Sequence, residues 1–184
     1  MIQATYIDHM GSDLSVVNAA RVSFGKKSQF EGRVGGPNVL SERDTKLVKY
    51  LAKHKHTSPF GHAFASFHVK APIFVARQLV KHKFLRWNEI SRRYVDDPPE
   101  FYVPDVWRGR SADKKQGSEG EVTLRTLDAA IISDSPYDAL SAYRAALNSG
   151  VAPEQARMVL PQSTMTEFYW SGSLDAFAAM CVLR

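Results

Sequence analysis

Residues 63–84 change from a strand-like to a helical hydrophobic period, and this change constrains the fold more than any other feature of the chain. Over residues 63–70, small or apolar side chains alternate with polar or aromatic ones, which is the pattern of a half-buried β-strand. Pro72 follows, and proline is favoured in the first turn of a helix because its missing N–H would be unpaired there. Apolar side chains then recur at helical spacing at Ile73, Ala76, Val80 and Phe84. The sequence therefore predicts a strand that passes directly into a helix ending near Phe84.

Residues 77–94 (RQLVKHKFLRWNEISRRY) carry an unusual density of positive charge. Six of these eighteen residues are Arg or Lys, one is His, and the only acid is Glu89. We expect residues 88–94 to form a loop. Cations suit a phosphate group, while Glu89, Ser91 and backbone groups suit the edges of a polar ring. The segment therefore indicates an anionic ligand that carries a ring, and a solvated basic helix is the alternative.

The composition favours one domain with anionic partners. The chain has 184 residues, of which 44% are apolar and 23% charged, as in ordinary globular domains. Its net charge of +5 favours nucleotides, phosphorylated cofactors or nucleic acid as partners. We expect no membrane span, because no run of about 18 apolar residues occurs. The single cysteine, Cys181, excludes an intrachain disulfide, favours a cytoplasmic location and is predicted to be a buried thiol.

Further strands and helices are predicted on both sides of this segment. We expect strands at residues 2–8, 100–104 and 164–170. Helices are expected to begin at the caps Ser12 or Asp13 and Ser41, and to cover residues 135–148, 154–160 and 174–183. Two loops, at about residues 25–40 and 105–130, are predicted to be flexible, solvated excursions.

Two other sites are not favoured by the sequence. Three histidines, His54, His56 and His62, lie within nine residues, but no acid or cysteine lies in the segment, and His54 and His56 do not share a helix face, so we expect no metal site. The chain also lacks a Walker phosphate loop and a GxGxxG dinucleotide motif. Without further information, the residues indicate only a basic single-domain protein that binds nucleotides.

The basic segment closely resembles the signature of the flavin-dependent thymidylate synthases. That signature reads Arg-His-Arg, seven residues, Ser, with an inner Asn-Glu and a closing Arg-Tyr. Here Lys81-His82-Lys83 corresponds to Arg-His-Arg, and Ser91 closes the gap; Asn88, Glu89, Arg93 and Tyr94 also fall in register. Both arginines are lysines, which keep the charge but lose the planar bidentate fork, and Arg86 stands where the family has a serine.

Longer stretches carry the same resemblance. Residues 67–78 match the family's Phe-His-Val-Lys-Ala-Pro-Ile-Phe-Val-Ala-Arg-Gln almost residue for residue, and residues 13–24 match its Asp-Leu-x-x-Val-x-x-Ala-Arg-Val-Ser-Phe run. Residues 56–62 are similar to its His-x-Thr-Pro-Phe-Glu-His, with Ser58 near the flavin-contacting Thr and Gly61 in place of Glu. The chain is identified as a divergent, for instance viral, member of the family.

The resemblance implies a fold and an activity. It implies an α+β domain over residues 1–184, with a mostly antiparallel sheet flanked by helices, that assembles as a homotetramer with sites shared between subunits. Such enzymes methylate deoxyuridine monophosphate (dUMP) at C5 to give thymidylate (dTMP). Methylenetetrahydrofolate supplies the carbon and reduced FAD the hydride, and NADPH reduces the flavin again.

The resemblance also assigns residues to this site. The expected substrate-binding residues are Gln78, Lys81, Glu89, Ile90, Ser91, Arg92, Arg93, Arg157 and Arg184. The expected FAD-binding residues are Ser58, Lys81, His82, Lys83, Glu89 and Ser173. Arg184 is expected to be catalytic, by stabilising negative charge on the pyrimidine ring.

Some departures leave other functions open. Ser173, Asp175 and Ala179 stand where the family has Asn, Arg and Asn, so we expect weaker FAD binding. Family members continue beyond the position of Arg184, so we expect the gene product to be longer than this chain. One alternative is a flavin enzyme of the same fold that transfers another one-carbon group or acts on another pyrimidine nucleotide. The other, which the resemblance does not favour, is a non-catalytic nucleic-acid-binding protein that stacks bases on Trp87 and Tyr94.

Overall fold

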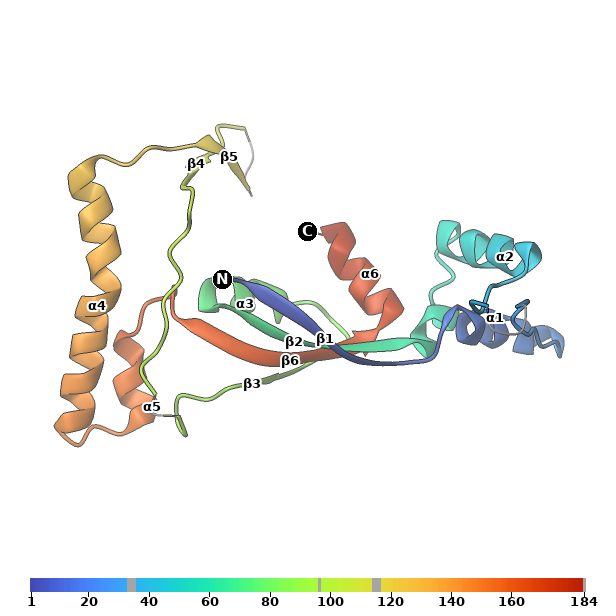
Figure 1. Ribbon diagram of the computed structural model, residues 1–184, viewed down its shortest axis with the longest axis horizontal. Coiled ribbons are helices and arrows are strands. Elements are labelled where there is room, and N and C mark those ends of the chain that lie inside the picture. The colour runs from blue at the N-terminus through green and yellow to red at the C-terminus, as the bar shows by residue number, and fades with distance from the viewer. Residues whose placement is uncertain (33–35, 96, 114–116, 184) are drawn as a thin grey trace. The chain divides into compact units, whose positions relative to one another are not determined.

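Four strands form one sheet in the order β1-β2-β6-β3 (Figure 1). The computed structural model describes all residues except 33–35, 96, 114–116 and 184. The strands of this sheet are β1 (Gln3–Met10), β2 (Phe64–Pro72), β3 (Leu85–Glu89) and β6 (Met165–Ser173). In Figure 1, β1 and β6 run in one direction and β2 and β3 in the other, and β3 pairs antiparallel with β6. The predicted α+β fold with an antiparallel sheet is confirmed.

An aromatic core covers one part of the sheet. The rings of Trp87 on β3 and Phe168 on β6 stack with their centroids 3.5 Å apart. Helix α6 (Leu174–Leu183) adds Phe177, whose ring meets those of Trp170 and Phe67 edge-on at 5.3 and 5.4 Å. Phe168 and Trp170 are both buried because side chains two residues apart lie on the same face of a strand. This core holds β3 against β6 and the start of α6 against the sheet.

The helices near the amino terminus begin at the predicted caps. Helix α1 (Asp13–Arg21) starts after Ser12, whose N–H donates to Ser15 Oγ at 3.0 Å. Helix α2 (Glu42–Lys53) starts after Ser41, whose Oγ accepts the Asp44 N–H at 3.1 Å. The short 3₁₀ helices η1 (Val22–Phe24) and η2 (Ser58–His62) follow them, and η2 packs against α1 and α6.

The chain divides into two compact units. The first consists of Met1–Ile2, Lys70–Arg77 and Ile90–Thr166, and the second of Gln3–Val69, Gln78–Glu89 and Glu167–Arg184. Strands β2 and β6 contribute residues to both units. The single-domain organisation expected over residues 1–184 stays a prediction.

The first unit contains a long helix that the sequence predicts only in part. Helix α4 (Thr126–Asn148) begins nine residues before the predicted start at Ser135, so that boundary is wrong. Pro136 lies inside the helix and cannot donate a hydrogen bond to the carbonyl of Ile132. The Ser135 hydroxyl donates to this carbonyl instead, at 3.0 Å, which explains why the proline does not end the helix.

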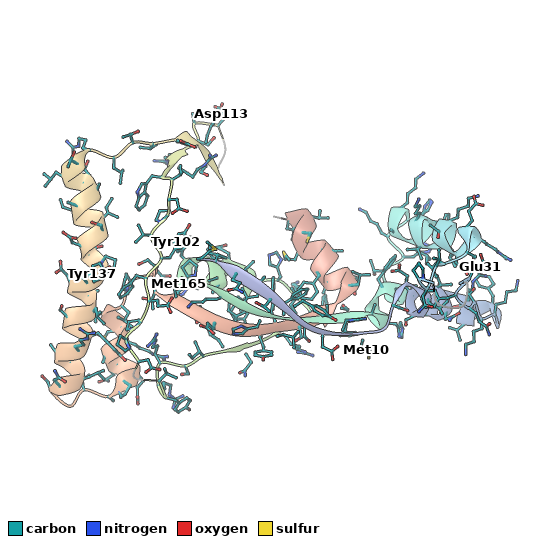
Figure 2. All side chains as sticks on the ribbon, in the orientation of Figure 1. Met10, Glu31, Tyr102, Asp113, Tyr137 and Met165 are labelled. Atoms are coloured by element: carbon teal, nitrogen blue, oxygen red, sulfur yellow. The ribbon has the colours of Figure 1, made fainter. Side chains whose placement is uncertain are left out.

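The remaining elements of the first unit are short. They are β4 (Arg108–Arg110), β5 (Ser118–Glu121), α5 (Pro153–Ala156) and η3 (Arg157–Val159). The predicted excursion at residues 105–130 thus contains an antiparallel pair, β4 with β5, and the first turn of α4. The strand expected at residues 100–104 is reduced to an isolated antiparallel bridge between Phe101 and Thr164. Tyr102 N–H donates to the Ser163 carbonyl and Met165 N–H to the Glu100 carbonyl, each at 2.8 Å. Tyr102 and Met165 are labelled in Figure 2.

The helix that follows β2 is shorter than predicted. Helix α3 (Ile73–Leu79) ends five residues before Phe84, and residues 85–89 form β3 where we expected a loop from residue 88. Pairing of β3 with β6 accounts for the difference, because it provides backbone hydrogen bonds and the stacking of Trp87. Phe84 adopts a left-handed backbone (φ 65°) at this reversal and is 80% exposed, so it does not extend the helical stripe of Ile73 and Ala76.

The predicted burial of Cys181 is wrong, because its side chain is exposed. Helix α6 is apolar along its length but buries Ala176 in its first turn, while Val182 and Leu183 at its end are exposed. An apolar sequence was therefore not a sufficient sign of burial here. No helix among the described residues is long and apolar enough to cross a membrane.

Candidate functional site

The basic segment contributes side chains from a helix end, a turn, a strand and a loop. Gln78 is on α3, Lys81, His82 and Lys83 are in the turn after it, and Glu89 ends β3; all belong to the second unit. Ile90, Ser91, Arg92 and Arg93 follow in the first unit, as does Arg157 in η3. Ser58 and Ser173 belong to the second unit, and Arg184 lies outside the described residues.

The turn presents its cations to solvent. Lys81 and Lys83 are exposed, and neither forms an ion pair in the part of the chain that the structure describes. The turn is closed by a hydrogen bond from His82 N–H to the Leu79 carbonyl at 3.1 Å and by the left-handed Phe84. A non-glycine residue in this conformation is strained, and such strain is common at ligand sites. The two lysines are therefore available to bind an anion.

Glu89 is held in place by the aromatic core. Trp87 Nε1 donates to Glu89 Oε2 at 3.2 Å, and the face of Trp87 is stacked on Phe168. Phe168 lies opposite Glu89 in the β3–β6 register, so the carboxylate belongs to the last paired residue of β3. Trp87 is thus a structural residue with one face covered, which weighs against its use as a platform for stacking nucleic-acid bases.

The loop after β3 is a tight turn held by its own residues. Tyr94 N–H donates to the Ser91 carbonyl at 3.0 Å, and Arg93 N–H donates to Ser91 Oγ at 3.3 Å. The Arg93 guanidinium lies over the Tyr94 ring, 5.3 Å from its centroid. Arg92 donates to the carbonyl of Asp97. These contacts order the loop and leave Arg93 exposed.

Arg157 is an exposed residue of the same unit. Its Nε donates to the backbone carbonyl of Glu154 at 3.3 Å, which is a local hydrogen bond and not an ion pair with the Glu154 side chain. A guanidinium anchored by one nitrogen keeps other donors for a ligand.

Ser58 lies on the wall of a cavity in the second unit. The cavity has a volume of about 830 Å³ and is bounded by α1, α2 and η2. Tyr50 and His56 form part of the wall together with Ser58. The ring centroids of Tyr50 and His56 are 6.1 Å apart. Cavities of this size with aromatic walls suit flat organic rings. We did not anticipate Tyr50 and His56, because no spacing in the sequence links a residue of α2 to this wall.

The family departures at positions 61 and 175 lie close to each other. A Cβ at Gly61 would lie 4.0 Å from Asp175 Oδ1. That oxygen is buried and has no hydrogen-bond partner among the described residues. Ser173, two residues before Asp175 in the chain, is 7% exposed, and Leu174 N–H donates to the Ala63 carbonyl at 2.8 Å. The departures from the family at Gly61 and Asp175 are therefore neighbours in the structure. The third departure, Ala179, lies on the same helix as Asp175 and is exposed.

Comparison with known proteins identifies similar sequences and structures. The family described as "Thymidylate synthase complementing protein" matches residues 5–184. A flavin-dependent thymidylate synthase of Thermus thermophilus is 45% identical over 178 residues, which cover 97% of this chain and 62% of that protein. The corresponding enzyme of Thermosipho melanesiensis is 42% identical over 167 residues, covering 90% and 69%. The chain thus spans about three fifths of the length of the Thermus thermophilus relative.

A solved structure is also similar. It is the UMP/dUMP methylase PolB from Streptomyces cacaoi bound with 5-Br dUMP, with a TM-score of 0.81 and 32% sequence identity. The superposition covers 96% of this chain and 75% of that protein. The same methylase bound with 5-Br UMP gives a TM-score of 0.74.

Proposed function

The chain belongs to the flavin-dependent thymidylate synthase family, and on that premise we propose that it carries out the reductive methylation of dUMP to dTMP. Methylenetetrahydrofolate is the carbon donor and NADPH the source of electrons. When bound, FAD supplies the hydride-transfer chemistry, and the protein supplies binding, orientation and charge. We include a cytoplasmic location in this proposal, because a single cysteine, Cys181, fits a reducing compartment.

The observation that carries the proposal is the agreement of sequence and fold over nearly the whole chain. The family match covers residues 5–184, and the similar solved structure holds a pyrimidine nucleotide analogue. The basic segment keeps Glu89, Ser91 and Arg93 in register with the family signature, at the paired end of β3 and in an ordered turn.

In this proposal the nucleotide is held by the residues expected from the sequence. Cationic side chains bind the phosphate through charge-assisted hydrogen bonds, and serine and glutamate groups bind the sugar and the ring edges. The set is Gln78, Lys81, Glu89, Ile90, Ser91, Arg92, Arg93 and Arg157.

The residues present also fit FAD. The cavity beside Ser58 has an aromatic wall for a flat ring, and the exposed Lys81 and Lys83 suit the pyrophosphate. His82, Glu89 and Ser173 complete the proposed flavin-binding set. The buried, unpartnered carboxylate oxygen of Asp175 is unfavourable to an anionic ligand nearby, so we expect FAD to dissociate more easily than from relatives with arginine there.

The catalytic assignment of Arg184 rests on the resemblance. In this proposal its guanidinium stabilises negative charge on the pyrimidine more strongly in the transition state than in the bound ground state, and therefore affects turnover more than affinity. Arg184→Lys should fold, bind FAD and lose most single-turnover activity, because lysine lacks the planar fork. If the lysine variant reacts within about threefold of the parent rate, the activation barrier has risen by less than ~1 kcal/mol, and the assignment is wrong.

We also propose that the protein is a homotetramer with sites shared between chains. Apolar side chains on the outer strand and the last helix support this, for example Tyr6 and Ile7 on β1 (53% and 44% exposed) and Val182 on α6 (87%). Light scattering should give the mass of four chains, and a stable monomer would contradict shared sites.

Product analysis tests the proposed activity. Purified protein is incubated with dUMP, methylenetetrahydrofolate, FAD and NADPH, and nucleotides are separated by chromatography. We expect dTMP to form and to require each component. A flavin that is reduced and reoxidised without dTMP would leave a different one-carbon transfer as the better explanation, and an absence of both reactions would contradict the enzyme assignment.

A second candidate substrate is UMP, because the similar solved structure is that of a UMP/dUMP methylase and has been obtained with 5-Br UMP. A parallel assay with UMP decides between the two. Equal rates would identify a methylase for both nucleotides, whereas a preference for dUMP of at least tenfold would support the thymidylate synthase activity.

A further inference from the structure

A second cavity in the unit that contains α1 and α2 has four cations among its nine lining residues. It has a volume of about 440 Å³, and its wall includes Arg21, Lys26, Lys27 and Arg43, with Glu31 and Asp44 as the only acids among its lining residues. Figure 2 marks Glu31, which lies close to α1 and α2. Lys26, Lys27 and Arg43 form no ion pair within the described residues. Among the lining residues described, cations therefore outnumber acids by four to two.

The floor of this cavity is rigid. Arg21 donates to Asp44 Oδ1 through Nε at 2.9 Å and again through a terminal nitrogen, and both side chains are nearly buried. Burial acts to raise the pKa of Asp44, but hydrogen bonds from Arg21, Ser28 and Ser41 outweigh it and lower the pKa below its ordinary value. The carboxylate thus stays ionised and engaged by Arg21, and it does not compete for the three other cations.

The loop that carries the two lysines is anchored to α1. Ser28 N–H donates to Asn18 Oδ1 at 2.7 Å, and Asn18 Nδ2 donates to the Ser28 carbonyl at 3.2 Å. Lys26 N–H donates to the Arg21 carbonyl at 3.2 Å, and Glu31 N–H to the Val39 carbonyl at 2.8 Å. The described part of the loop at residues 25–40 is therefore tied to its neighbours by hydrogen bonds.

The cationic cavity adjoins the aromatic-walled cavity beside Ser58. The two share Arg21, Lys26 and Arg43 in their walls. A charged chain bound in the smaller cavity would therefore lie beside the larger cavity, where we place the flavin ring. Oxyanions bound by two lysines and an arginine in such a cleft gain both charge-assisted hydrogen bonds and a locally raised concentration.

We propose that Lys26, Lys27 and Arg43 form a binding site for the anionic tail of a co-substrate, a chain of carboxylates or phosphates attached to an aromatic ring. This inference rests on the proposed function, whose two co-substrates both carry such a tail. The folate carries glutamyl carboxylates, and NADPH carries phosphates. The site is separate from the basic segment at residues 77–94, which binds the phosphate of dUMP and the flavin.

Inorganic pyrophosphate tests the cations without any need for flavin or turnover. The parent chain for this calorimetric titration carries Lys81→Gln and Lys83→Gln, so that the lysines assigned above to the flavin pyrophosphate do not bind the probe. It is compared with the triple variant Lys26→Gln, Lys27→Gln, Arg43→Gln made in the same background. Lys49→Gln serves as the matched control, because Lys49 is an exposed cation of α2 that lines neither cavity. We expect the triple variant to bind pyrophosphate at least tenfold more weakly and the control to remain within twofold of the parent. Equal binding by parent and triple variant, or no saturable binding by the parent, would overturn the proposal.

Two further comparisons identify the source of the tail. If the tail is a carboxylate chain, the parent binds pteroyltriglutamate more tightly than pteroylmonoglutamate, and the triple variant loses that difference. If it is a phosphate, the triple variant loses the parent's preference for NADPH over NADH. Loss of neither preference would contradict a co-substrate tail. These binding results stand apart from the dTMP assay, so a failure of the proposed function and a failure of this site can be told apart.

Discussion

The buried Arg21 of the α1–α2 region and the exposed lysines of the basic segment at residues 77–94 differ in their partners. In the first, the Arg21 side chain is 12% exposed and is bound by Asp44, whose side chain is 4% exposed. In the second, Lys81 and Lys83 are exposed, and within the described residues they form no ion pair. A buried charge needs a fixed partner, whereas an exposed one can exchange water for a ligand.

This difference separates stability from binding. Replacing a cation of the buried pair should change the free energy of unfolding, and replacing an exposed one should change ligand affinity alone. It also explains how lysines can stand where the family signature has arginines: the fold does not depend on either side chain.

The largest expected effect comes from breaking the buried pair. Asp44→Ala leaves the Arg21 guanidinium buried without its partner, and we expect the free energy of unfolding to fall by about 3–5 kcal/mol. Lys81→Gln should change it by less than about 0.5 kcal/mol. Urea denaturation measures both. A loss below about 1 kcal/mol for Asp44→Ala would mean that the pair does not stabilise the fold.

Gly11, which precedes α1, provides a second test of the rigid region. Its φ is +84°, and an added Cβ would lie 2.7 Å from the His62 carbonyl oxygen. Gly11→Ala should therefore cost about 2–4 kcal/mol, from backbone strain and a steric clash together. Gly25→Ala is the control, because Gly25 also has a positive φ (+62°) but nothing within 4 Å, and it should cost only about 1–2 kcal/mol. Equal losses of stability would exclude the clash.

Arg157 should show the opposite behaviour. Arg157→Ala is expected to weaken dUMP binding by about 1.5–3 kcal/mol, the range for a charge-assisted hydrogen bond, with no change in the urea midpoint. Arg144→Ala, which removes another exposed arginine of the same unit, is the control. Calorimetry gives both affinities. Unchanged dUMP affinity in Arg157→Ala would mean that Arg157 does not bind the nucleotide and only makes its local hydrogen bond with the Glu154 carbonyl.

The sequence predicted the features that depend on near neighbours. The caps Ser12 and Ser41 were recognisable because an N-cap bonds to groups three residues away. The ion pair of Arg21 and Asp44 joins residues 23 apart, and nothing in either local sequence marks it. The early end of α3 depends likewise on β3 pairing with β6, a contact between distant segments.

The candidate site was predictable to a similar degree. The family signature identified residues 77–94, and the structure describes all of its named side chains. The signature did not identify Tyr50 and His56 in the cavity wall, nor the cations Lys26 and Lys27. These residues come together only when α1, α2 and their loops pack against each other. The Asn18–Ser28 contacts that anchor the loop likewise join residues ten apart.

A smaller effect is expected from pH. The folded-state pKa of Asp44 lies below its ordinary value of 3.8, so its contribution to stability is complete above about that pH and is lost as the pH falls through the folded-state pKa. Urea unfolding between about pH 5 and pH 2 should therefore show stability falling toward acid pH, and Asp44→Asn should reduce that slope. An identical slope in the two proteins would show that Asp44 is not linked to folding.

The central claim is that the exposed cations of the basic segment bind the flavin and do not hold the fold. FAD is titrated into the parent, into Lys81→Gln with Lys83→Gln, and into the control Lys49→Gln, and the flavin absorbance is followed. The account predicts saturable binding to the parent and control, and a loss of affinity of about 1.5–3 kcal/mol in the double variant, with all three unfolding at the same urea concentration. Equal FAD affinity in the double variant and the parent, or no saturable binding by the parent, would contradict it.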